Sequence, residues 1–278
     1  MTMNKPMKVA AIQMVSSPDV ARNLARARHW LEQAREQGAE LAALPEYFCL
    51  MGRADTDKLA IAEVPGELGE KGKGPIQQML SDAARELGLW IIGGTLPLRT
   101  GSPERARNSC LVFAPDGAQA ARYDKIHLFR YDNGREHYDE GNVLEAGNEP
   151  VTVQAGPARV GLSVCYDLRF AELYRPRGDE PCDLLSVPAA FTYTTGKAHW
   201  ELLLRARAVE NQAYVIAPAQ GGQHENGRRT WGHTMIVDPW GEVLSQLPEG
   251  EGLVTATLDP ARLAQVREQL PALQHRRL

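Results

Sequence analysis

The sequence predicts an α/β fold in which two β-sheets pack face to face and the helices lie outside them. Strand-like and helix-like segments alternate over residues 7–94, which is typical of crossover connections. Residues 108–122 and the turn at 238–241 instead indicate hairpins. Strands also outnumber helices. This mixture of connections favours two packed sheets over a single sheet with helices on both faces.

The first predicted unit is a strand, a helix and a second strand. Residues 7–14 form an apolar run suited to a buried strand. Ser17 and Pro18 predict an N-cap and a first-turn proline, and Gly38 is expected to end the helix. Residues 41–44 return as a strand. The helix between them has apolar side chains at spacings of four and three: Val20, Leu24, Ala27, Leu31 and Ala34.

The pattern then repeats and changes to a hairpin. Gly88 is expected to end a second helix, and residues 89–94 follow as a strand. Residues 108–122 predict two strands around a turn at 115–117, which reads Pro-Asp-Gly. The second helix is predicted from one apolar stripe: Ile76, Met79, Leu80, Ala83, Ala84 and Leu87.

The last part of the chain adds three strands, a helix and a hairpin. Residues 160–164 and 184–187 are apolar runs expected as buried strands, and 213–217 is a third. Residues 197–211 predict a helix, and 238–241 predict a hairpin turn. The apolar side of the helix is expected to carry Trp200, Leu203, Leu204 and Val209.

Composition indicates one folded domain over residues 1–278. Hydrophobic residues make up 43% and charged residues 24%, and the net charge is −4. This excludes a mainly disordered chain, and it gives no strong field for nucleic acid or an anionic membrane. The Gly-rich stretch at 66–74 is too short to separate two domains.

The sequence also suggests a compartment. No apolar run approaches the ~18 residues that span a bilayer, and the first residues lack a signal-peptide pattern, so we expect a cytoplasmic protein. The cysteines show no zinc-ligand spacing and are expected as thiols: Cys49, Cys110, Cys165 and Cys182.

Glu46 is the first candidate functional residue. It follows a strand directly, in the segment LPEYF, between a proline and two aromatic residues. An apolar setting raises a carboxyl pKa and suits a general base. The alternative is a solvent-facing glutamate at a strand end.

Lys125 is the second candidate, in the segment YDKIHLF after a strand. A lysine held among apolar residues can stabilise an oxyanion or lower the pKa of a nearby thiol. The alternative is an ordinary edge lysine that discourages strand pairing.

Cys165 is the third candidate, where a strand leads into a short helix in GLSVCYDLRF. Backbone N–H groups and the positive end of a helix dipole there would favour the reactive thiolate. The alternative is a buried structural cysteine, which we expect for the other three. Ser163 is a poor nucleophile candidate because position 165 is not the glycine of a G-x-S-x-G turn.

These three segments together resemble the nitrilase superfamily of carbon–nitrogen hydrolases, whose catalytic Glu, Lys and Cys follow strands in this order. The resemblance extends from KVAAIQM to LQHRRL. Within the superfamily the second half resembles the Nit branch, on the segments CYDLRFAELYR, AHWELLLRARAVENQAYVIAPAQ and GHTMIVDPWGEV. The resemblance implies a four-layer α-β-β-α sandwich and catalysis without a metal or organic cofactor.

The resemblance also implies further site residues. A second glutamate in the site matches Glu140 best, with Glu136 and Glu145 as alternatives. The N–H of Tyr166 would join the Lys125 ammonium in holding an oxyanion. Cations for substrate carboxylates would be Arg169 and Arg175, or these arginines form structural salt bridges instead.

The implied activity is that of a thiol-dependent amidase acting on a small-molecule amide through a thioester. The resemblance favours deaminated glutathione, cleaved to 2-oxoglutarate and cysteinylglycine, over the ω-amidase substrates 2-oxoglutaramate and 2-oxosuccinamate. An alternative of another class is a catalytically silent binding protein. His127, His199 and His233 are expected to be structural rather than the base of a Cys–His protease. The resemblance implies a homodimer or larger homo-oligomer, paired through residues 169–177 and 197–211.

Overall fold

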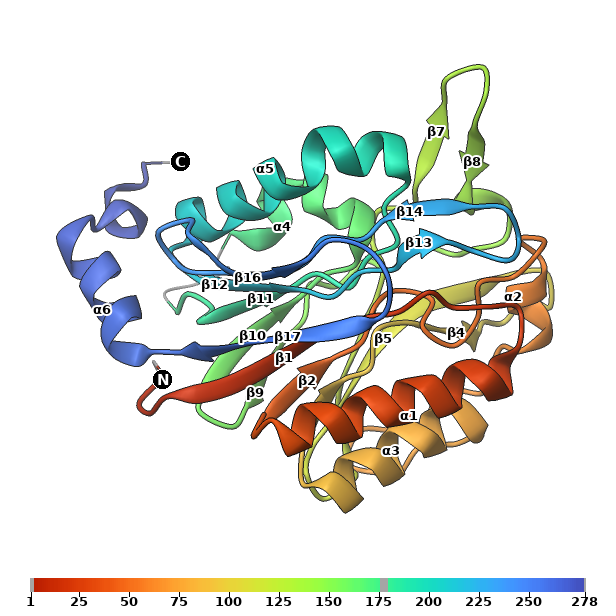
Figure 1. Ribbon diagram of the computed structural model, residues 1–278, viewed down its shortest axis with the longest axis horizontal. Helices are drawn as coiled ribbons and strands as arrows, with labels where there is room; N and C mark the ends of the chain where they lie inside the picture. The colour runs from red at the N-terminus through yellow and green to blue at the C-terminus, as the bar shows by residue number, and fades with distance from the viewer. Residues whose placement is uncertain (1–2, 176–179, 278) are drawn as a thin grey trace.

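The computed structural model describes residues 3–175 and 180–277, and its strands form two large sheets (Figure 1). The first sheet has seven strands in the order β17-β1-β2-β3-β5-β4, with β6 paired to β5. The second has six, in the order β16-β15-β12-β11-β10-β9. The strands of the first sheet are β1 (Met7–Gln13), β2 (Leu41–Ala43), β3 (Trp90–Ile92), β4 (Leu96–Arg99), β5 (Ala106–Phe113), β6 (Gln119–Asp124) and β17 (Gly252–Leu258). Those of the second are β9 (Thr152–Ala155), β10 (Ala158–Leu162), β11 (Leu184–Ser186), β12 (Tyr214–Ala217), β15 (Thr234–Val237) and β16 (Val243–Leu247).

Helices cover the outer face of each sheet, and two small hairpins lie at one end of the molecule (Figure 1). The hairpins are β7 (Arg130–Asp132) with β8 (His137–Asp139), and β13 (Gly221–Gln223) with β14 (Arg229–Trp231). The helices are α1 (Val20–Glu36), α2 (Asp57–Ala60), α3 (Pro75–Leu87), α4 (Ala171–Tyr174), α5 (Tyr193–Asn211) and α6 (Pro260–Gln269). Short 3₁₀ helices are η1 (Glu140–Asn142), η2 (Cys165–Arg169) and η3 (Ala272–His275).

The alternation of side chains along β1 explains the layers. Val9 and Ala11 belong to the core between the two sheets, whereas Ala10 and Ile12 belong to the core beneath α1 and α3. Successive side chains of a strand point to opposite faces, so a strand buried on both faces is apolar throughout. The helices α1 and α3 cover the first sheet and α5 covers the second (Figure 1), which confirms the four-layer α-β-β-α sandwich.

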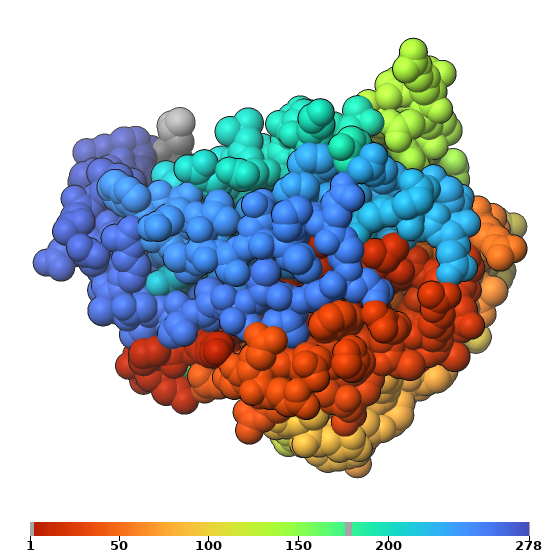
Figure 2. Space-filling model, viewed as in Figure 1, coloured from red at the N-terminus to blue at the C-terminus, as the bar shows by residue number. Residues whose placement is uncertain are grey.

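Strands from the two ends of the described chain pair with each other. β17 runs antiparallel to β1, from Met7 opposite Leu258 to Gln13 opposite Gly252. The N-terminal segment in red and the C-terminal segment in blue accordingly lie side by side on the face shown in Figure 2. The sequence did not predict this pairing.

Most predicted elements are confirmed, including the hairpin of β5 and β6 around the turn at 115–117. The predicted N-cap of α1 is wrong. Asp19, not Ser17, caps the helix by accepting from the Arg22 N–H at 3.1 Å. The Ser17 hydroxyl instead lies 3.1 Å from Asn23 Oδ1, because Pro18 separates it from the first turn of the helix.

The helix α5 also differs from the prediction. It begins at Tyr193, four residues earlier than expected, because Thr192 caps it by accepting from the Thr195 N–H. Trp200 and Leu204 face the core as predicted, but Val209 is 47% exposed. The strand before Cys165, β10, spans Ala158–Leu162 rather than 160–164.

Candidate active site

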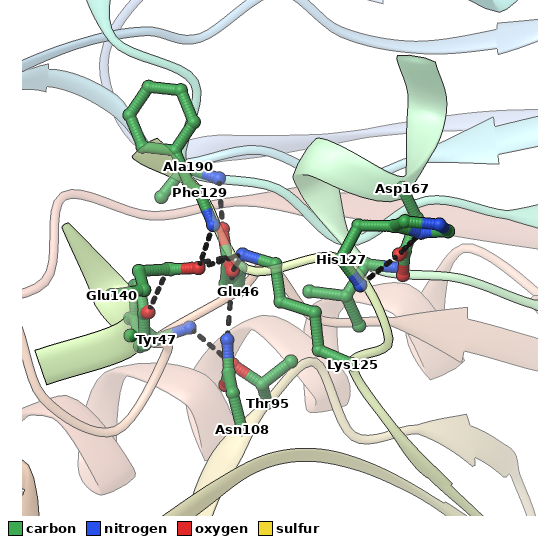
Figure 3. A network of polar contacts seen from close by, with 12 residues as sticks. Glu46, Tyr47, Thr95, Asn108, Lys125, His127, Phe129, Glu140, Asp167 and Ala190 are labelled. Carbon is green, nitrogen blue, oxygen red and sulfur yellow. Dashed lines mark hydrogen bonds and ion pairs between the residues drawn. The ribbon is translucent and has the colours of Figure 1, made fainter. Parts of the chain in front are cut away.

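Glu46 lies just beyond β2, with its carboxylate in the interior. The side chain is 1% exposed, so the solvent-facing alternative is wrong. Glu46 Oε1 accepts from Asn108 Nδ2 and from Lys125 Nζ, each at 2.9 Å, and Oε2 accepts from the Ala190 N–H at 2.9 Å (Figure 3). Three fixed donors therefore orient both oxygens of this carboxylate.

Lys125 follows β6 and lies between two carboxylates (Figure 3). Its Nζ donates to Glu46 Oε1 at 2.9 Å and to Glu140 Oε2 at 2.8 Å. The side chain is fully buried, so the edge-lysine alternative is wrong. Burial lowers the pKa of Lys125, but the charges of Glu140 and Glu46 outweigh burial and hold it well above its ordinary value. Lys125 is therefore a fixed cation.

Glu140 is the one of the three candidate glutamates that contacts Lys125. It begins η1 and also accepts from the Tyr47 hydroxyl at 2.6 Å and from the Phe129 N–H at 2.7 Å (Figure 3). Burial raises the pKa of Glu140, but the Lys125 charge and these hydrogen bonds outweigh burial and hold it below its ordinary value. Glu136 instead accepts from Thr194, and Glu145 pairs with Arg107.

Cys165 opens η2 in a backbone conformation that few residues other than glycine adopt. Its φ is 50°, and its N–H donates to the Pro188 carbonyl at 2.9 Å. Such left-handed residues cost of order 1–3 kcal/mol and persist where the surroundings hold them. The turn leaves the Cys165 side chain on the wall of a pocket that Glu46 and Ala190 also line.

Burial outweighs the local features that favour a thiolate at Cys165. Burial raises its pKa most, the Glu46 charge raises it further, and the result lies well above the ordinary thiol value. Lys125 and the Ala190 N–H lower this pKa but do not compensate. The helix that follows is a five-residue 3₁₀ helix, too short for a strong dipole. Burial and the neighbouring Glu46 charge therefore favour the protonated thiol over the thiolate.

Removing the Glu46 charge should separate thiol ionisation from catalysis. In Glu46→Gln we expect the pH profile of Cys165 alkylation by iodoacetamide to move to lower pH, because the neighbouring negative charge that raises the thiol pKa is gone. Amide turnover should fall at least ~10²-fold because the base is lost. Mass spectrometry from about pH 6 to pH 10 measures the alkylation. The control Glu136→Gln should change neither the alkylation profile nor amide turnover. An unshifted alkylation profile in Glu46→Gln would contradict the assignment of Glu46 as a group that raises the Cys165 pKa.

Asp167 joins the segment that carries Lys125 to the segment that carries Cys165. It is fully buried, and it accepts from the Val164 N–H at 2.9 Å and from the Tyr123 hydroxyl at 2.7 Å. The His127 N–H and ring nitrogen Nδ1 lie 3.0 and 2.7 Å from Asp167 Oδ1 (Figure 3). Tyr123 and His127 flank Lys125 at two residues on either side, so one carboxylate fixes both segments.

We expect Asp167→Asn to lower both stability and turnover. An amide replaces a carboxylate that only accepts, so at least one buried donor loses its partner at a cost of about 1–3 kcal/mol. Urea unfolding measures the stability and a steady-state assay measures kcat. The exposed turn variant Asp116→Asn is the matched control and should change neither. If Asp167→Asn kept full stability and kcat, this carboxylate would not hold the two segments.

A pocket of about 320 Å³, partly open to solvent, lies over these groups. Tyr166 and Arg169 line it, together with Phe129, Phe191 and Arg228. The Tyr166 N–H donates to no acceptor among the described residues, so it is available to a ligand.

Several other predicted residues lie outside this pocket. Arg175 donates to Glu210 at 3.2 Å. It therefore forms a structural salt bridge and does not serve as a cation for a substrate carboxylate. His127, His199 and His233 do not line the pocket, and His127 pairs with Asp167 instead. Four further residues contribute to the site without a sequence pattern that indicates them: Tyr47, Asn108, Asp167 and Arg228.

Over 3–175 and 180–277, no group of three or more His, Cys, Asp or Glu side chains is arranged to hold a metal ion. Within the same ranges no helix has the length and apolarity needed to cross a membrane.

The family is shown by comparison with known proteins. The carbon–nitrogen hydrolase family model matches residues 8–268, and the chain belongs to this family of enzymes that cleave carbon–nitrogen bonds. Similar proteins include a deaminated glutathione amidase of Synechocystis, 42% identical with 98% of each chain covered, and the omega-amidase NIT2 of Homo sapiens, 38% identical with 97% of this chain and 95% of that protein covered. Saccharomyces cerevisiae Nit3, a solved member of branch 10 of the nitrilase superfamily, is similar with a TM-score of 0.88 and 30% identity over 99% of this chain and 98% of Nit3. These comparisons confirm the resemblance drawn from the sequence.

Proposed function

We propose that this protein is a thiol-dependent amidase whose nucleophile is Cys165. The observation that carries the proposal is the buried Glu46–Lys125–Glu140 network at a pocket that the Cys165 side chain also lines. Glu46 accepts the thiol proton as the sulfur attacks the amide carbonyl and a C–S bond forms. Because the resting thiol has a raised pKa, proton transfer and attack are coupled.

Two donors of the pocket stabilise the oxyanion formed by this attack. Lys125 supplies a buried ammonium, and Tyr166 supplies a free backbone N–H at the start of η2. Such donors contribute about 3–4 kcal/mol each in other hydrolases. Glu46 then gives its proton to the leaving nitrogen as the C–N bond breaks, which leaves a thioester on Cys165.

Hydrolysis of the thioester completes the cycle. Glu46 takes a proton from water, the hydroxide attacks the thioester carbonyl, and the acid product leaves as the sulfur regains its proton. Glu140 keeps Lys125 fixed through hydrogen bonds to both carboxylate oxygens, at 2.8 and 3.1 Å. Glu140 therefore contributes to catalysis by positioning Lys125. Because it also lines the pocket, it orients the substrate.

The substrate that we propose is deaminated glutathione, cleaved to 2-oxoglutarate and cysteinylglycine. Support comes from the Synechocystis relative named a deaminated glutathione amidase, which covers nearly the whole chain. The relative named omega-amidase makes hydrolysis of 2-oxoglutaramate or 2-oxosuccinamate the second candidate. Arg169 at the pocket wall suits the carboxylate that all three substrates carry.

A substrate panel tests this assignment. We expect kcat/KM to be highest for deaminated glutathione, lower for 2-oxoglutaramate and 2-oxosuccinamate, and lowest for a simple nitrile. A preference for 2-oxoglutaramate would reverse the order of the two candidates. Mass spectrometry of an acid-quenched reaction should find the acyl group on Cys165, whereas a silent binding protein would carry none.

We further propose one catalytic domain that forms a homodimer in the cytoplasm. Leu202 and Val209 are 67% and 47% exposed on α5, the helix expected to pair subunits. Of the other predicted segment, 169–177, residues 176 and 177 lie outside the described residues. The four cysteines are free thiols, which suits a reducing compartment. Light scattering tests the dimer.

A further inference from the structure

The pocket wall carries two guanidinium groups that come from different parts of the fold. Arg169 is the last residue of η2, and Arg228 lies in the turn between β13 and β14. Across the described ranges, neither has a carboxylate within ion-pair distance, although many other arginines do. The neighbouring Arg229, for example, donates to Glu249 at 2.9 Å. Among the described residues, both pocket arginines therefore lack an anionic partner.

Arg169 is held against the pocket by aromatic rings. Its guanidinium lies 5.6 Å from the Tyr166 ring centre and 5.4 Å from that of Phe191. It is also 3.2 Å from the His199 ring nitrogen. Because it stands on the same short helix as Cys165, it is placed for the part of the substrate that becomes bonded to sulfur.

Arg228 is held by a different element. It lies 5.0 Å from the ring centre of Tyr138, a residue of the hairpin β7–β8 that projects from the body of the molecule (Figures 1 and 2). The positive charge of Arg228 lowers the pKa values of Tyr138 and Tyr47, although burial keeps both above their ordinary value.

The two arginines differ in the part of the substrate that each can bind. A substrate with one carboxylate can satisfy one guanidinium, whereas an amide with a carboxylate on each side of the scissile bond can satisfy both. The leaving half must depart while the acyl half stays on Cys165. Arg228 belongs to a separate hairpin rather than to the helix of the nucleophile, so it is placed for the departing half.

We propose that Arg228, held by Tyr138, is a second carboxylate receptor that binds the leaving-group side of the substrate. The pocket then selects amides that carry a carboxylate on both sides of the cleaved bond. This inference rests on the proposed amidase function. It gives the hairpin β7–β8 a role in specificity through its contact with Arg228.

Two substrates and two neighbouring arginines test the proposal. Deaminated glutathione has a carboxylate on both sides of the amide, whereas 2-oxoglutaramate has one on the acyl side only. For Arg228→Gln we expect KM for deaminated glutathione to rise about 10- to 100-fold, the loss typical of a hydrogen bond to a charged group. KM for 2-oxoglutaramate should change less than about 3-fold, which also shows that the variant is folded. The matched control Arg229→Gln should leave both values unchanged.

Other outcomes would overturn the proposal. An equal rise in KM for both substrates would mean that Arg228 binds the shared acyl half or acts structurally. An unchanged KM for both would mean that Arg228 does not bind substrate. If the wild-type protein hydrolyses neither substrate, the amidase proposal fails, and calorimetry still tests Arg228. Deaminated glutathione should bind Cys165→Ala at least ~10-fold more tightly than the double variant with Arg228→Gln. Equal binding by the two, or none by either, would overturn the inference.

Discussion

Replacing Cys165 with alanine should abolish amide hydrolysis while leaving the fold intact. The thiol supplies the atom that bonds to the acyl group, and no other described nucleophile lines the pocket with the same Glu46 and Lys125 neighbours. Loss of a nucleophile in other hydrolases costs about 10⁶ in kcat. Because the side chain is small and 7% exposed, the free energy of unfolding should change by less than about 2 kcal/mol.

The measurement is steady-state turnover of deaminated glutathione together with urea unfolding. Cys182→Ala is the matched control, because Cys182 is also a free thiol but lines a different cavity. It should retain wild-type kcat. Turnover by Cys165→Ala within about tenfold of the wild type would contradict a thioester mechanism.

Replacing Lys125 with methionine should give the second largest loss, in both catalysis and stability. The oxyanion loses its ammonium, which predicts a fall in kcat of at least ~10²–10³. Glu46 and Glu140 then remain buried without their cation. Breaking a buried ion pair by removing one partner costs about 3–5 kcal/mol.

The stability loss should depend on pH in a defined direction. In the wild type the pKa of Glu140 is held below its ordinary value of 4.5, so its ionised form contributes stability above pH 4.5 that is lost as the pH falls through the lowered value. The stability gap between wild type and Lys125→Met should therefore narrow in acid. Urea unfolding at several pH values measures this gap. The exposed variant Lys197→Met is the control, and a gap that widened in acid would contradict the ion-pair assignment.

The sequence was sufficient to identify the residues at strand ends, because strand ends are local features. Glu46 and Cys165 each follow a recognisable apolar run, and Lys125 follows a hairpin. Their meeting in one pocket could be inferred only from the family resemblance. Asn108 and Asp167 could not be predicted as site residues, because their partners Glu46 and Tyr123 lie 62 and 44 residues away in the sequence.

The direction of the Cys165 pKa shift could not be predicted from the sequence, for a different reason. The local pattern of strand, cysteine and helix favours a thiolate, but the sign of its pKa shift depends on burial and on a carboxylate more than a hundred positions earlier. Arg228 could not be predicted as a site residue for a similar reason. The stretch Gln223–Arg229 reads as a polar surface turn, and only the fold brings Arg228 to Tyr138.

The pairing of β1 with β17 has a consequence for biosynthesis. A ribosome releases β1 long before the strand that covers its outer edge, because Met7 pairs opposite Leu258. Until then β1 offers unpaired backbone groups and an apolar surface to other nascent chains, the kind of edge that promotes aggregation. Chaperone demand during synthesis should therefore persist until β17 emerges, and mutations in β17 should reduce yield more than activity.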